Sequence, residues 1–163
     1  VAEDRAPAEA ARLGIDWPYL VATSYRRLTG RNLAGSTGDE TPEAVAAALA
    51  AASVPVLAHG LEPEPILHYV NPACARRFAT TPDALLGLPS SATTLPDDRP
   101  QRTAAFEMVR RRGWVDDYSG IRVDRNSRRF EIVQGTIWEV RDDAGVRVGD
   151  AAVLEVTADI DDA

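Results

Sequence analysis

The two histidines of the chain are its side chains best suited to binding a metal or moving a proton. His59 and His68 flank the turn sequence 60–65, which separates two short apolar runs. If this turn closes a regular hairpin, the imidazoles lie across from each other, within reach of one metal ion or one anionic ligand. Two ligands are too few for a metal site, so Glu62 or Glu64 would have to supply a third. The alternative is that His59 hydrogen-bonds to turn carbonyls and fixes the loop.

If the chain is an enzyme, we expect its reacting groups among His59, Glu62, His68 and Tyr118. A serine nucleophile has no support, because Ser119 has no histidine at a recognisable spacing. The glycine-rich stretch 30–38 lacks the spacing and the lysine of a phosphate-binding loop. No pattern identifies a cofactor, so the sequence leaves the cofactor unknown.

Four helix starts are marked by a capping side chain and a nearby proline. The pairs are Asp16 with Pro18, Thr41 with Pro42, Asn71 with Pro72, and Thr81 with Pro82. The second of these helices is predicted to run through 44–52. A longer helix is predicted over Arg99–Arg112, and Gly113 is placed to end it.

The first helix follows a tail expected to be frayed and carries an apolar stripe near helical spacing. The stripe consists of Trp17, Leu20, Val21 and Leu28. Because these side chains must pack against something, we expect this N-terminal helix to contact a protein partner or a second copy of the chain.

Five strands are predicted from apolar runs and from period-2 alternation. Two short ones, 54–59 and 66–70, form a hairpin around the turn 60–65. From Trp114 onward the period changes from about 3.6 to 2. Three long strands are expected there, over 114–124, 129–141 and 146–157, and the turns 125–127 and 142–145 join them.

The middle long strand divides into two faces. One face is expected to hold Phe130, Ile132, Gln134, Thr136 and Trp138. If this face is buried, its polar members Gln134 and Thr136 need hydrogen-bond partners.

Length and charge exclude several classes of protein. The chain has 163 residues and a net charge of −7, and all its basic residues are arginines. This length fits one domain, and the acidic balance argues against a nucleic-acid partner. There is no long apolar run that would cross a membrane and no apolar stretch typical of a secretory signal, so we expect a cytoplasmic protein.

The predicted order of elements resembles that of a PAS domain, and three segments resemble the MEKHLA family of PAS-related domains. The segments are SYRRLTGR at 24–31, VLAHGLEPEPILHYVN at 56–71, and WVDDYSGIR at 114–122. The resemblance covers about residues 17–155. It implies an α+β fold: a PAS-like five-stranded antiparallel sheet with short helices and one longer helix on one face. We expect an N-terminal helical extension over 1–53 and a PAS-like core over 54–158.

A PAS-like fold implies a ligand pocket between the inner face of the sheet and the small helices. The residues expected to bind a ligand there are Tyr69, Phe78, Phe106, Tyr118, Phe130, Gln134, Thr136 and Trp138. The alternative is that these side chains only fill the core. Cys74, the single cysteine, is expected to be packed and unreactive, because 71–75 is not the asparagine–cysteine motif of light-sensing, flavin-binding PAS relatives.

The resemblance leaves three functions open. MEKHLA domains occur as free-standing bacterial proteins and at the C-terminus of plant homeodomain–leucine zipper regulators, where they are regarded as sensory or as controlling dimerisation. We therefore expect a free-standing sensory or ligand-binding module that acts through protein–protein contacts. The alternatives are a small enzyme or accessory protein of bacterial secondary metabolism, and a structural dimerisation module with a filled core.

Overall fold

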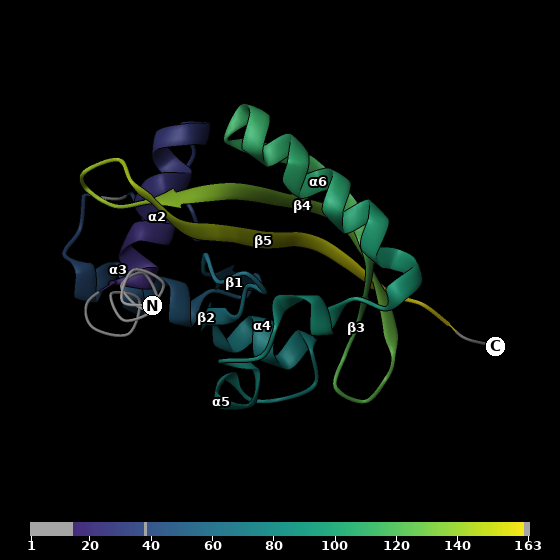
Figure 1. Cartoon of the computed structure of the whole chain (residues 1–163). Coiled ribbons are helices and arrows are strands. Elements are labelled where there is room, and N and C mark those ends of the chain that lie inside the picture. Colours follow the sequence, from purple (N-terminus) through teal and green to yellow (C-terminus); the bar gives the residue numbers. More distant parts are fainter. Residues whose placement is uncertain (1–14, 38, 162–163) are drawn as a thin grey trace, which may run out of the picture.

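The computed structural model describes residues 15–37 and 39–161, so the tail expected to be frayed lies outside the described residues. Within them, five strands form one antiparallel sheet in the order β2-β1-β5-β4-β3 (Figure 1). The strands are β1 (Val56–His59), β2 (Leu67–Val70), β3 (Trp114–Val123), β4 (Arg129–Arg141) and β5 (Arg147–Asp159). The hairpin and the meander predicted from the sequence are both confirmed.

The helices fall into two groups. Before the sheet come α2 (Trp17–Thr29) and α3 (Pro42–Ala51). Between β2 and β3 come α4 (Pro72–Arg77), α5 (Pro82–Leu85), the 3₁₀ turns η1 (Ser90–Thr93) and η2 (Pro96–Asp98), and α6 (Arg99–Arg112). None of the helices in the described part of the chain has the length and apolar character needed to cross a bilayer. This arrangement confirms the α+β fold expected from the resemblance.

Each of the four predicted helix caps forms. The side chains of Asp16, Thr41, Asn71 and Thr81 accept hydrogen bonds from backbone N–H groups in the first turns of α2, α3, α4 and α5. A proline occupies the first or second position of each helix, where its missing N–H costs no hydrogen bond. Gly113 ends α6 in the left-handed conformation, with φ of 86°.

The two faces of the sheet carry two separate hydrophobic clusters. Alternate residues of one strand belong to different clusters, because successive side chains point to opposite faces. Trp138 and Val140 pack with α2 and α3 on what we term the outer face. Ile137 and Leu154 pack with α4, α5 and α6 on the inner face. α6 runs along the sheet, against β3 and β4 (Figure 1).

The apolar stripe of α2 packs on the chain's own sheet. Trp17, Leu20 and Val21 are buried in the outer-face cluster, and Leu28 packs at its edge. The indole N–H of Trp138 donates to the carbonyl of Val21 at 3.1 Å, which fixes the helix against β4. The stripe therefore has its partner within the same chain, which corrects our argument that it awaits a second molecule. A protein contact at α2 would have to use its outward side.

A one-residue irregularity in β4 reverses the faces that simple alternation predicts. The pairing of β4 with β5 shifts register on both sides of Gln134. Phe130 and Ile132 lie in the inner-face cluster, as expected, but Trp138 lies in the outer-face cluster. The extra residue at a bulge changes the phase of the side chains beyond it. The prediction that Phe130 and Trp138 share a face is therefore wrong.

Asn71 joins the N-terminal helices to the sheet. Its side chain is fully buried and makes four hydrogen bonds. The amide oxygen accepts from the backbone N–H groups of Val56 and Cys74, and the amide nitrogen donates to the carbonyls of Leu49 and Val54. One side chain thus ties together α3, β1 and α4.

We predict that Asn71→Ala destabilises the protein by about 3 kcal/mol or more, because it leaves buried backbone donors and acceptors without partners. Urea unfolding followed by tryptophan fluorescence measures the change. Asn126→Ala, in the exposed turn between β3 and β4, is the matched control and should change the stability by less than about 0.5 kcal/mol. Equal effects of the two substitutions would contradict the role of Asn71.

Candidate functional site

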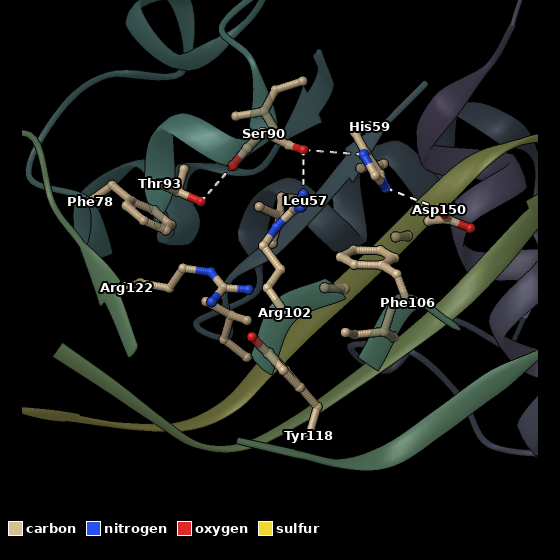
Figure 2. Close-up of a pocket in the computed structure, with 16 residues that line it drawn as sticks. Leu57, His59, Phe78, Ser90, Thr93, Arg102, Phe106, Tyr118, Arg122 and Asp150 are labelled. Atoms are coloured by element: carbon tan, nitrogen blue, oxygen red, sulfur yellow. Dashed lines mark hydrogen bonds and ion pairs between the residues drawn. The ribbon is translucent and has the colours of Figure 1, made fainter. Parts of the chain in front are cut away.

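A cavity of about 50 Å³ lies between the inner face of the sheet and the segment formed by η1 and α6 (Figure 2). A water molecule needs roughly 10–15 Å³ of such space, so the cavity holds a few waters or a small ligand. Its apolar lining includes Leu57, Leu67, Phe78, Ile137 and Leu154. Its polar lining consists of His59, Ser90, Thr93, Arg102, Tyr118, Arg122 and Asp150.

The cavity has a mouth at the surface. A surface groove between the β1–β2 turn and α6 shares four residues with the cavity. These are His59, Arg102, Phe106 and Asp150, which we call the mouth residues. Arg102 and Phe106 are half-buried, and the guanidinium of Arg102 lies 4.7 Å from the centre of the Phe106 ring.

Three of the residues predicted to bind a ligand line the cavity. Phe78 follows α4, Phe106 lies on α6, and Tyr118 lies on β3. Phe130 is buried in the same cluster, but it lies beside Phe78, at 5.2 Å between ring centres, and does not line the cavity. Tyr69 packs at the edge of the outer-face cluster, so it does not line the cavity either.

The other three predicted residues lie elsewhere because of the register shift in β4. Gln134 is exposed. Thr136 is buried, and its hydroxyl donates to the carboxylate of Glu155. Trp138 is buried beneath α2. The expectation that these three side chains face the pocket is therefore corrected.

The two histidines have separate partners. The ring nitrogen Nε2 of His68 lies 2.8 Å from the carboxylate of Glu62, and its ring stacks on Trp17 at 5.2 Å between centres. Nε2 of His59 instead lies 3.2 Å from Asp150. The strand pairing shifts register at His59, so its Cα faces Leu67 and not His68. Among the described residues, no group of three His, Cys, Asp or Glu side chains is placed to hold a metal.

Asp150 is the most heavily compensated charge of the site. It is only 2% exposed, and it accepts hydrogen bonds from His59, Arg110 and Arg147. Burial by itself would raise the pKa of Asp150, but these three hydrogen bonds outweigh it and hold the pKa well below the ordinary value. Arg110 also donates to Glu139 at 2.7 Å, so one arginine of α6 binds carboxylates on both β4 and β5.

A chain of hydrogen bonds connects Asp150 with Arg102. An ionised carboxylate only accepts, so the Nε2–H of His59 donates to Asp150. Nδ1 of His59 lies 3.3 Å from the hydroxyl of Ser90, which accepts a hydrogen bond of 2.5 Å from the guanidinium of Arg102. Figure 2 shows this path from Arg102 through Ser90 and His59 to Asp150. The path fixes Arg102 at the mouth.

A second arginine and a tyrosine come from β3. Tyr118, Gly120 and Arg122 alternate along the strand and are all buried. A Cβ at Gly120 would lie 2.6 Å from the Tyr118 hydroxyl and 3.6 Å from Nη1 of Arg122. The missing side chain of Gly120 therefore lets the phenol lie along the strand, with its hydroxyl beside the guanidinium.

Neither cavity arginine has an acidic partner. Arg122 is 8% exposed and donates to the carbonyl of Ile121, and in the described part of the chain neither Arg122 nor Arg102 forms an ion pair with a carboxylate. The hydroxyl of Tyr118 is buried without a hydrogen-bond partner. Burial, together with the nearby charge of Arg122, lowers the pKa of Arg102 to about 10, so Arg102 is still a cation at neutral pH.

Sequence reasoning missed Ser90, Arg102, Arg122 and Asp150. A signal for Arg122 was present, because it follows Tyr118 and Gly120 at the period of a strand. Asp150 carries no comparable signal, because its burial follows from the pairing of β5 with β1 and β4. Arg102 carries no such signal either, because only the packing of α6 on the sheet brings it to the cavity.

The comparisons with known proteins agree with this architecture. The family model for the MEKHLA domain matches residues 15–157. No curated protein sequence matches the chain significantly.

Solved structures show the same fold at low sequence identity. The PAS domain of a protein from Colwellia psychrerythraea has a TM-score of 0.59 and 13% identity, over 72% of this chain and 95% of that one. A light-oxygen-voltage domain studied with a flavin analogue has a TM-score of 0.55 and 14% identity, over 74% and 84%. A PAS domain from a two-component sensor histidine kinase has a TM-score of 0.54 and 16% identity, over 68% and 90%.

We predict that Asp150→Asn destabilises the protein by about 3 kcal/mol at pH 7, because it removes the buried carboxylate that accepts hydrogen bonds from His59, Arg110 and Arg147. The pKa of Asp150 is lowered on folding, so the ionised group stabilises the fold above the unfolded-state pKa of about 3.9. This contribution falls as the pH drops below that value. The stability difference between wild type and variant should therefore shrink by about 1 kcal/mol between pH 7 and pH 3.

Urea unfolding at the two pH values measures this difference. Asp143→Asn, in the exposed turn between β4 and β5, is the control and should match wild type at both. A difference that stays constant with pH would contradict the assignment of a charged, stabilising Asp150.

Proposed function

Because the chain belongs to the MEKHLA domain family and folds as a PAS domain, we propose that it is a sensory module that binds a small molecule in the inner-face cavity. Binding would then be passed on by contact with another protein or with a second copy of the chain. The observation that carries this proposal is the buried hydroxyl of Tyr118, which lies in the cavity wall without a hydrogen-bond partner. A buried polar group in that state costs stability, and a ligand that pairs with it recovers the loss.

The size and the lining of the cavity favour a ligand site over a core filled by side chains. Side chains of a core pack to leave few voids larger than one water molecule, and this cavity is several times that size. It also combines apolar walls with a small number of convergent polar groups, as ligand sites do. A purely structural dimerisation module has no need for either feature.

A flavin does not fit this site. The cavity of about 50 Å³ is far smaller than a three-ring flavin. A covalent flavin adduct needs a thiol that faces the ligand, but Cys74 is fully buried in the inner-face cluster and does not line the cavity. Burial also raises the pKa of the Cys74 thiol, which makes it less reactive. The similarity to light-oxygen-voltage domains is therefore limited to the fold.

The hydrogen bonds of the site also suggest an alternative to ligand sensing, which is a hydrolytic activity. Ser90, His59 and Asp150 are linked in the order of a serine-protease triad. However, the backbone N–H of Ser90 donates to Pro65, and that of Ala92 donates to Pro89, so neither is available to stabilise an oxyanion. The charge of Asp150 is also shared with two arginines. We therefore propose that Ser90, His59 and Asp150 hold Arg102 in place.

Of the other proposed acid–base groups, Glu62 and His68 pair with each other outside the cavity.

The contact with a partner is proposed at the outward side of α2. Asp150, at the mouth, follows Gly149, and a Cβ at Gly149 would lie 2.9 Å from the Trp17 ring at the start of α2. The close approach of β5 to Trp17 gives a mechanical connection between the cavity and α2. Arg27 on the same helix is exposed and available to a partner, whereas Arg26 already contacts Asn32 and Asp39.

Ligand binding is tested with wild type and Ala152→Leu, which fills the cavity from β5. Native mass spectrometry detects a co-purified molecule, and thermal unfolding with short alcohols, amides and carboxylates detects added ones. At about ten times the dissociation constant, a probe should stabilise wild type by about 1.4 kcal/mol and raise Tm by about 3–5 °C. The filled variant should show no shift, whereas Ala158→Leu, exposed on the same strand, should respond as wild type does.

If no probe shifts wild type and its mass is bare, the filled-core dimerisation module replaces this proposal. An equal response of wild type and Ala152→Leu would show that binding occurs outside the cavity.

Hydrogen exchange tests the connection to α2. A probe that binds the cavity should slow amide exchange in β1, β3, β5 and α6, and also in the first turns of α2 after Trp17. The matched control is α3, which does not reach the mouth and should not change. Protection confined to the cavity elements would contradict the proposed connection.

A further inference from the structure

Building on the proposed ligand-binding function, we propose that the ligand is a small organic acid. Its carboxylate binds between Arg102 and Arg122 and accepts a hydrogen bond from Tyr118, and its short apolar part lies against the aliphatic wall of the cavity.

The charges around the cavity support an anion. The carboxylate that lines the cavity is compensated: Asp150 binds Arg110 and Arg147, and the neighbouring Glu139 also binds Arg110. Arg102 and Arg122 are the exceptions among the residues that line the cavity. Two cations facing one partly dehydrated space repel each other, as the effect of Arg122 on the pKa of Arg102 shows. An anion between them removes the repulsion and supplies the missing partner for both.

The geometry places three donors around one space. Arg102 reaches it from α6, and Arg122 and Tyr118 reach it from β3. Figure 2 shows Arg122 and the hydroxyl end of Tyr118 directed toward the space beside Arg102. Each arginine is already held by other contacts: Arg102 by Ser90, and Arg122 by the Ile121 carbonyl and the Tyr118 ring. Donors held in place before binding lose little conformational entropy when the ligand arrives.

The remainder of the lining selects a carboxylate with a short apolar part. A guanidinium matches a carboxylate through two parallel hydrogen bonds. The lining also has an aliphatic part, which includes Leu57, Ile137 and Leu154. Inorganic phosphate would leave this apolar surface uncovered and would carry more bound water to remove. The small volume limits the apolar part to a few carbon atoms.

The test compares acids with their neutral amides. Isothermal titration calorimetry at pH 7 measures the dissociation constants of four acids, namely acetate, propionate, butyrate and hexanoate. The same measurement is made for the matching amides, acetamide, propionamide, butanamide and hexanamide, and for inorganic phosphate. We expect the best acid to bind at least about tenfold more tightly than its amide, a difference of about 1.4 kcal/mol, and phosphate to bind more weakly than that acid. Hexanoate should bind more weakly than butyrate, because the volume of the cavity is too small for the longer hydrocarbon chain.

Two variants locate the carboxylate. Arg122→Gln should weaken binding of the best acid by about tenfold or more and leave binding of its amide unchanged, because only the acid loses a charged partner. Tyr118→Phe should weaken binding of the acid severalfold, since it removes one hydrogen bond. Arg128→Gln, an exposed arginine in the turn between β3 and β4, is the matched control and should bind both compounds as wild type does.

The outcomes separate the two proposals. Amides that bind as tightly as acids, or phosphate that binds more tightly, would overturn the carboxylate assignment while the ligand-binding function stands. Acid binding that Arg122→Gln leaves intact would also overturn the assignment. If neither acids nor amides bind wild type, and its native mass is bare, the ligand-binding function itself fails.

Discussion

The buried charge of Asp150 is the constraint around which the site is arranged. A carboxylate that is 2% exposed must be compensated, and its partners come from three elements: His59 from β1, Arg110 from α6, and Arg147 from β5. Because Arg110 also binds Glu139 on β4, the same network fastens α6 to the centre of the sheet. Nδ1 of His59 lies 3.3 Å from the hydroxyl of Ser90, and this hydroxyl accepts a hydrogen bond from Arg102 at the mouth.

The elements could be predicted from the sequence because their signals are local. Capping residues followed by proline, a closing glycine at Gly113 and period-2 alternation each depend on neighbours a few positions apart. The bounds expected for α6 and β4 therefore agree with the structure. The family resemblance implied that the five strands form one antiparallel sheet, which no local signal contains, and the structure adds their order in that sheet.

The site could be predicted only in part, because its composition depends on interactions between distant segments. Phe78, Phe106 and Tyr118 could be predicted because they are aromatic residues on the inner side of their elements. Gln134, Thr136 and Trp138 were misplaced because a register shift in β4 reverses the phase of its side chains. His59 and His68 were expected to act together, but a shift at His59 and two separate carboxylates keep them apart. Alternation predicts faces only where the strand is regular.

If the cavity binds an anion as proposed, the contrast between compensated and uncompensated charges provides a route by which binding changes the protein. Arg102 is the one mouth residue that touches both the proposed anion position and the path to Asp150. A guanidinium has five N–H donors, so Arg102 can bind the proposed anion and keep its hydrogen bond to Ser90, whose hydroxyl lies 3.3 Å from Nδ1 of His59. A ligand changes a conformational equilibrium only by its difference in affinity for the two states. Under the proposed function this difference would arise at Arg102, and the hydrogen bonds of Asp150 connect Arg102 with α6 and with β5, beside the start of α2.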